Sequence, residues 1–224
     1  SISNIKIMIQ RQEKTLYSAV TPVAITSSTD ATPIVITATS HGLTTGDRVL
    51  IYGHTTNIAA NGIFKAVVLT ANTFQLTDEL TGASIAGSGA GAGANGLLVV
   101  APPVLLVTDF RNIVLQVSTS GSATVTLKVA GSTGKPEASA LTSPRYDYPN
   151  MGATVIPANP YTFLQIINLD TAATVNGATG IAVTGTDINN QYEVNINVQK
   201  YITVIPVSWT QGAITVKAIM TSNA

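Results

Sequence analysis

Short runs rich in Val, Ile and Thr, separated by turn residues at intervals of about 8–12 positions, constrain this chain to β structure more than any other feature. In the first half the runs are 34–38, 48–52, 62–68 and 73–76. Asn61-Gly62 is a favoured hairpin pair because both residues tolerate positive φ. No stretch has the apolar period of a useful helix. The pattern therefore predicts an all-β chain of antiparallel strands.

The second half carries further runs, at 113–118, 123–129, 163–169 and 192–198. In the last of these, apolar and polar residues alternate, which is typical of a half-buried strand. We expect two hairpins here. One joins the first two runs through 119–122, and the other closes the chain around Thr210-Gln211-Gly212. Such a pattern predicts an antiparallel β-sandwich, with Trp209 in its core.

Composition changes and prolines divide the chain into three parts. We expect an N-terminal arm or strand at 1–23, a small β-domain at 24–101, and the β-sandwich at 104–224. A Gly-rich loop at 87–96 lies in the second part and contains a formal G-x-G-x-x-G pattern. Nucleotide binding needs a helix directly after that pattern, and the run that follows it cannot form one. The segment 133–161 is expected to be a long loop.

The N-terminal arm is an alternating apolar segment followed by a charged cluster, Arg11-Gln12-Glu13-Lys14. Ile5, Ile7 and Ile9 alternate with polar or flexible residues, which predicts a strand. An apolar strand at a terminus pairs with a partner. Two partners remain open: a neighbouring molecule, with Ile5, Ile7, Ile9 and Arg11 as assembly contacts, or the sheet of the same chain.

The low charge of the chain limits the classes of partner that it can bind. Lys plus Arg number 11 and Asp plus Glu number 11, so the formal net charge is zero. Only 10% of residues are charged, against about 25% in an ordinary soluble domain. This disfavours nucleic-acid and membrane-surface partners. A neutral surface rich in Thr and Ser suits a protein packed against copies of itself or a partner, while a stable secreted β-domain is the alternative.

Residues that could carry catalysis are sparse. The chain lacks cysteine, which excludes thiolate chemistry. His41 and His54, with Asp47 between them, could bind a metal ion in principle, but no third strong ligand stands at a suitable spacing. Asp78 and Glu79 are the only adjacent acids; neighbours on a strand face opposite ways, so they are interpreted as a solvated turn. We expect no enzyme activity, cofactor or metal.

Two parts of the chain carry a resemblance to known proteins. The stretches 36–49, 61–62 and 71–76 resemble a small β-barrel module common in tailed-bacteriophage structural proteins, a module that is similar to the first catalytic-cysteine half-domain of ubiquitin-activating enzymes. Without cysteine, no ubiquitin chemistry follows. The stretches 109–115, 177–187 and 192–195 resemble uncharacterised virion β-sandwich proteins.

The resemblance implies a virion component with no chemistry of its own. The leading hypothesis is a capsid decoration or cement protein that contacts the major capsid protein and forms a homo-oligomer, with a trimer implied by the family alone. The alternative is a tail-associated fibre, adaptor or glycan-binding receptor protein. Its candidate receptor contacts are Tyr146, Tyr148 and Tyr161, which could equally anchor the loop. A polysaccharide hydrolase or lyase is disfavoured by the lack of paired acids.

Overall fold

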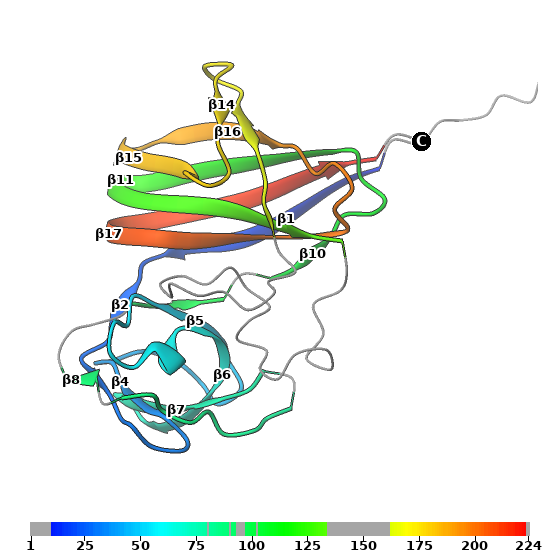
Figure 1. Cartoon of the computed structure of the whole chain (residues 1–224). Coiled ribbons are helices and arrows are strands. Elements are labelled where there is room, and N and C mark those ends of the chain that lie inside the picture. The colour runs from blue at the N-terminus through cyan, green and yellow to red at the C-terminus, as the bar shows by residue number, and fades with distance from the viewer. Residues whose placement is uncertain are drawn as a thin grey trace, which may run out of the picture. The chain divides into compact units, whose positions relative to one another are not determined.

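The structure is a computed structural model that describes residues 10–79, 81–89, 91–92, 97–101, 103–133 and 162–222 (Figure 1). Its strands form two antiparallel sheets. The described residues contain no α-helix, only a 3-10 turn, η1 (Ile58–Ala60). The all-β expectation is confirmed. No helix in the described part of the chain is long and apolar enough to cross a membrane.

The chain divides into two compact units, one for each sheet. The first unit comprises the described residues of 20–101. The second unit comprises the described residues of 10–19, 103–133 and 163–222. The chain therefore starts in the second unit, passes through the first, and returns.

The sheet of the first unit is open in the described residues, because its two end strands are not paired with each other. In sheet order its strands are β2 (Val23–Ala24), β9 (Leu97–Val100), β5 (Arg48–Tyr52), β6 (Gly62–Thr70), β7 (Thr73–Thr77), β4 (Val35–Thr37), β3 (Ser27–Ser28) and β8 (Gly91–Ala92). The expected barrel is thus not closed. The end strands have two residues each, too few for a closing ladder of hydrogen bonds.

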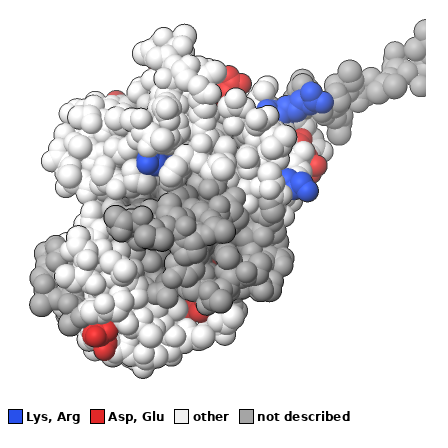
Figure 2. All heavy atoms as spheres, viewed as in Figure 1, with Lys and Arg blue, Asp and Glu red and all other residues white. Residues whose placement is uncertain are grey.

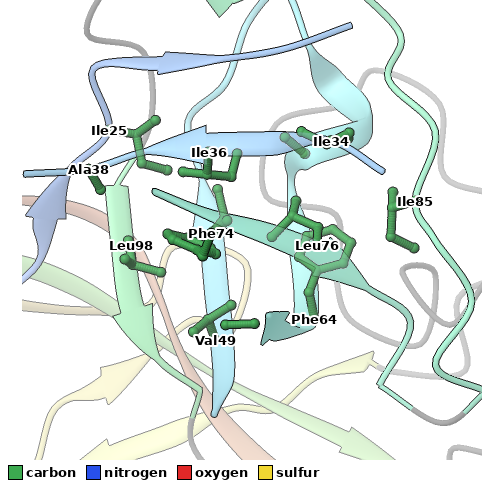
Figure 3. Packing of buried hydrophobic residues seen from close by; sticks show 13 residues of the cluster. Ile25, Ile34, Ile36, Ala38, Val49, Phe64, Phe74, Leu76, Ile85 and Leu98 are labelled. Atoms are coloured by element: carbon green, nitrogen blue, oxygen red, sulfur yellow. The ribbon is translucent and has the colours of Figure 1, made fainter. Parts of the chain in front are cut away.

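Alternating side chains of these strands form the core of the first unit. Phe74 and Leu76 of β7 point inward while their neighbours stay half-exposed, which is the period of a strand. Figure 3 shows Ile36 of β4 and Leu98 of β9 meeting Phe74 from other strands. All are buried. Removal of this apolar area from water is the main stabilisation of the unit.

The second unit is built on two long paired strands, β11 (Asn112–Ser132) and β17 (Tyr201–Thr221). They pair along their whole length, from Asn112 opposite Thr221 to Ser132 opposite Tyr201. Two strands pair with β17: β1 (Arg11–Val20) and β10 (Leu105–Leu106). Three strands pair with β11: β12 (Thr162–Phe163), β15 (Ile181–Thr186) and β16 (Asn189–Val194). Beyond β16 the sheet continues with β13 (Ile166–Asn168) and then β14 (Thr174–Val175). All are joined in one network of paired strands.

Both hairpins expected in the second half are absent, because each predicted turn lies inside a continuous strand. Gly121 has a φ of 77° and Gly212 a φ of 84°, values that a hairpin turn would also use. Here they belong to the irregular middle of the β11–β17 pair, where the register shifts between Ser120 and Thr124. A glycine in this conformation serves a β-bulge as readily as a turn. Trp209 is buried, as expected.

The N-terminal segment of the second unit pairs with its own chain from residue 11 onward. β1 lies at the end of the sheet, next to β17. Arg11 begins this strand and is exposed. Ile5, Ile7 and Ile9 lie outside the described residues.

Candidate functional site

His41, in the loop between β4 and β5, has a structural role. His41 is only 7% exposed. Its Nδ1 accepts the Leu43 N–H at 3.0 Å, and its Nε2 lies 3.1 Å from the Thr70 carbonyl. A carbonyl only accepts, so the ring proton must be on Nε2. With both nitrogens occupied, His41 has no lone pair for a metal ion.

The remaining polar residues of the same loop serve its geometry. Asp47 accepts the Thr44 N–H at 2.8 Å and the Thr44 hydroxyl at 3.0 Å. Gly46 has a φ of 100° and donates its N–H to the Ala66 carbonyl. The loop motif therefore ties β5 to β6.

A second histidine is buried without partners for its ring. His54 is 2% exposed. Among the described residues, neither of its ring nitrogens has a hydrogen-bond partner, and the same holds for the buried Tyr52 hydroxyl. Burial lowers the pKa of His54 and raises the pKa of Tyr52. Only the main chain of His54 is engaged, in a pair of hydrogen bonds with the Asn61 amide of 2.8 and 2.9 Å.

No metal centre arises from these groups. Within the described residues, no three His, Cys, Asp or Glu side chains come together in a way that could hold a metal ion. A single imidazole ring does not make a metal site, because a bound metal ion needs further protein ligands. The described residues thus do not bring His41, His54 and Asp47 together as a ligand set.

The adjacent acids are not a solvated turn, and that interpretation was wrong. Asp78 is only 5% exposed, and its Oδ1 accepts the Thr81 N–H at 2.8 Å. Glu79 is ion-paired with Arg48 of β5. Both carboxylates are held by the first unit because the chain turns back on itself at this point, with the Gly82 N–H bonded to the Asp78 carbonyl.

A groove of about 470 Å³ lies in the second unit, at one end of its sheet. Ile113 and Val194 are the last paired residues of β11 and β16 at this end. Both strands end near this point, β16 at Val194 and β11 at Asn112, and Ile167 of β13 lines a further side of the groove. The lining residues are Phe110, Arg111, Ile167, Glu193, Val194, Asn195, Ile196 and Asn197.

The groove lies where β16 ends, and this end comes earlier than the sequence predicts. The alternating run was expected to continue as a strand to 198, but β16 stops at Val194. Asn197 has a φ of 46° and lies in a turn that the Gln199 N–H closes on the Ile196 carbonyl at 2.8 Å. Val198, at this turn, is 69% exposed instead of facing the core.

Four polar side chains that line the groove are free to bind a ligand. Arg111, Glu193, Asn195 and Asn197 make no side-chain hydrogen bond or ion pair with any other residue that the structure describes. Their main chains, in contrast, are held: the Arg111 N–H bonds the Thr221 carbonyl at 3.0 Å, and the Asn195 N–H bonds the Gln165 carbonyl at 3.1 Å. The groove therefore combines a fixed frame with free polar groups.

The second candidate surface is the outer edge of β1. The Ser222 N–H donates to the Gln10 carbonyl at 2.9 Å. This bond shows that the main-chain groups of Gln10 face β17. Main-chain groups of successive residues in an antiparallel strand point to opposite sides, so those of Arg11, Glu13 and Thr15 point away from β17. No other strand of the described chain pairs with this side. It is an open edge.

Charged side chains are few on the face of the molecule that Figure 2 shows. On the face drawn in Figure 2, Lys, Arg, Asp and Glu stand apart among uncharged side chains. On β1, Glu13 is paired with Lys217 of β17 at 2.9 Å, and this contact lowers the pKa of the Glu13 carboxyl. No large patch of one sign is visible on that face.

Tyr146, Tyr148 and Tyr161, the predicted receptor contacts, are outside the described residues. The groove was missed because its parts are far apart in the sequence. The one local signal was the pair of asparagines, Asn195 and Asn197, at the polar positions of an alternating run, since Asn tolerates the positive φ at which strands end.

Comparisons of the chain with protein-family models, with characterised proteins and with solved structures find no match.

Proposed function

We propose that this chain is a non-enzymatic structural protein of a tailed-bacteriophage particle, and that it acts as a capsid decoration or cement protein. In this proposal the open sheet of the first unit corresponds to the small barrel-like module, and the second unit to the virion β-sandwich. The observation that carries the proposal is the open edge of β1 in a chain with few charged residues.

An open strand edge offers association without electrostatic attraction. The outward main-chain groups of Arg11, Glu13 and Thr15 can pair with an added strand. Such pairing supplies hydrogen bonds and buries apolar area, which suits a chain with zero net charge. The charged side chains of β1 limit this edge to partners with a matching pattern, because edge charges oppose unspecific pairing.

The added strand comes, in this proposal, from a second copy or from the major capsid protein. The alternating segment that holds Ile5, Ile7 and Ile9 has the pattern of such a strand. A ring of copies, in which each gives one strand and receives one, is a closed head-to-tail assembly. A trimer, which the resemblance implies, is one such ring.

The test is the number of copies in the particle, measured by quantitative mass spectrometry of purified virions. A copy number of the same order as that of the major capsid protein supports a place on the shell. A few copies per particle would contradict the decoration role. Absence from the particle would overturn the virion assignment altogether.

The alternative, a tail-associated fibre, adaptor or receptor-binding protein, has one observation in its favour. The groove of the second unit is recessed and lined by free polar groups, as ligand sites are. A low copy number together with binding of the protein to host cells would select this alternative.

A further inference from the structure

We propose that the groove between the ends of β11, β13 and β16 binds a neutral saccharide. The inference goes beyond the assembly role and does not depend on the place of the protein in the particle. It rests on three properties of the groove: an apolar platform, free groups that both donate and accept hydrogen bonds, and a lining without net charge.

The apolar platform consists of side chains from two separate segments. Phe110, just before β11, is half-buried, and Ile167 of β13 is 38% exposed. A sugar ring has one or two faces made of C–H groups. Those faces pack on aromatic and aliphatic side chains, as apolar ligand surfaces do in pockets of this size, about 300–1,000 Å³.

The polar lining matches hydroxyl groups in kind. The side-chain amides of Asn195 and Asn197 each carry donors and an acceptor, and a sugar hydroxyl is likewise both. Glu193 only accepts and Arg111 only donates. Together these groups can satisfy neighbouring hydroxyls of one ring, in whichever direction each hydroxyl points.

The charges of the groove favour a neutral ligand over an anion. Arg111 and Glu193 contribute one positive and one negative charge to the same lining. Phosphate and carboxylate ligands are bound by clustered cationic groups, and a carboxylate among them would repel an anion. A sugar without charged groups avoids that repulsion.

The frame of the groove is fixed before any ligand binds. The Phe110 N–H bonds the Val107 carbonyl at 3.1 Å, and the turn at Asn197 is closed by the 2.8 Å bond between Gln199 and Ile196. A site whose main chain is already ordered loses less conformational entropy on binding. This favours measurable affinity for a small ligand.

The test is an NMR titration of the full chain with neutral oligosaccharides of glucose, galactose, N-acetylglucosamine and rhamnose. We expect at least one of them to shift the backbone amides of 110–111 and 193–197. Phe110→Ala and Asn195→Ala should each weaken binding about tenfold or more. Thr184→Ala, an exposed position of β15 in the same unit, is the matched control and should leave binding unchanged.

Failure of the site is distinguishable from failure of the fold. Each variant is first checked for a dispersed amide spectrum, and Phe110→Leu, which keeps an apolar side chain, covers the case in which the alanine variant unfolds. The inference is overturned if no oligosaccharide shifts these amides, if the shifts lie on another surface, or if Phe110→Ala binds as the unsubstituted chain does. Binding of only a sialylated or phosphorylated sugar would overturn the claim of a neutral ligand.

Discussion

The indole N–H of Trp209 donates a 2.9 Å hydrogen bond to the carbonyl of Gly212, further along the same strand. This contact spans the irregular middle of β17, where the strand carries a glycine of positive φ in place of a hairpin turn. The buried ring also meets Tyr17 of β1 edge-to-face, with centroids 6.4 Å apart. Trp209 thus joins the bend of β17 to the strand beside it.

Two glycines of the bent strand pair should differ sharply in their tolerance of a side chain. A Cβ at Gly212 would lie 2.3 Å from the Ser122 carbonyl oxygen, whereas a Cβ at Gly121 would meet nothing within 4 Å. Both have positive φ, which costs an alanine about 1–2 kcal/mol. We expect Gly121→Ala to lose that amount and Gly212→Ala to lose at least about 2 kcal/mol more. Chemical denaturation followed by tryptophan fluorescence measures both, and equal losses would refute the bulge geometry.

Removal of the His41 ring should destabilise the first unit. His41→Ala deletes two hydrogen bonds, each worth about 1 kcal/mol, and the edge-to-face contact with Phe74 at 5.1 Å between centroids. We expect a loss of about 2–3 kcal/mol in the free energy of unfolding. Thr39→Ala, an exposed position just before the loop, serves as the control. An unchanged unfolding midpoint for His41→Ala would show that the ring is not structural.

The stability of the first unit should fall in acid because of His54. Burial holds the pKa of His54 below its ordinary value of 6.5, so the unfolded chain takes up a proton that the folded chain resists. The contribution of His54 is complete above pH 6.5 and is lost as the pH falls from there through the folded pKa. We expect His54→Leu to flatten the pH dependence between pH 7.5 and about 5, as measured by urea unfolding at each pH. If the variant and the unsubstituted chain keep parallel profiles, His54 does not titrate in this range.

Association through β1 should be blocked by a proline on its open side. The main-chain N–H of Thr15 points away from β17 by the alternation of the ladder, so Thr15→Pro removes no hydrogen bond of the sheet while it denies one to an added strand. We expect a smaller species in analytical ultracentrifugation and an unfolding midpoint within a few degrees of that of the unsubstituted chain. Thr15→Ala keeps the N–H and should associate normally.

Charge reversal at Arg11 gives an independent check of the same edge. Arg11 begins β1 and is exposed, so Arg11→Glu should leave folding within about 0.5 kcal/mol. An added strand with a matching charge pattern would meet a like charge there, which is destabilising. Weaker association, seen as a shift to smaller species at equal concentration, is the expected result. Unchanged association of both this variant and Thr15→Pro would move the contact to another surface.

The alternation of apolar residues by itself determined the class of fold and many of the strands. The run 48–52 coincides with β5, and 73–76 lies within β7, because side chains of a strand alternate between a packed and a solvated face. The burial of Trp209 followed from its size and apolar character in the same way. These are local properties, and local patterns predict them.

The partner of each strand was decided by the tertiary structure alone. A glycine of positive φ has the same local conformation in a hairpin turn and in a bulge, so Gly121 and Gly212 were assigned to turns although β11 and β17 each continue past them as one strand. Asp78 was expected in solvent, but the chain folds back over it. The groove shows the same limit most clearly: Phe110, Ile167 and Asn197 meet only because the register of β11, β13 and β16 brings their ends together. Contacts between segments distant in the sequence depend on strand pairing, which no local pattern specifies.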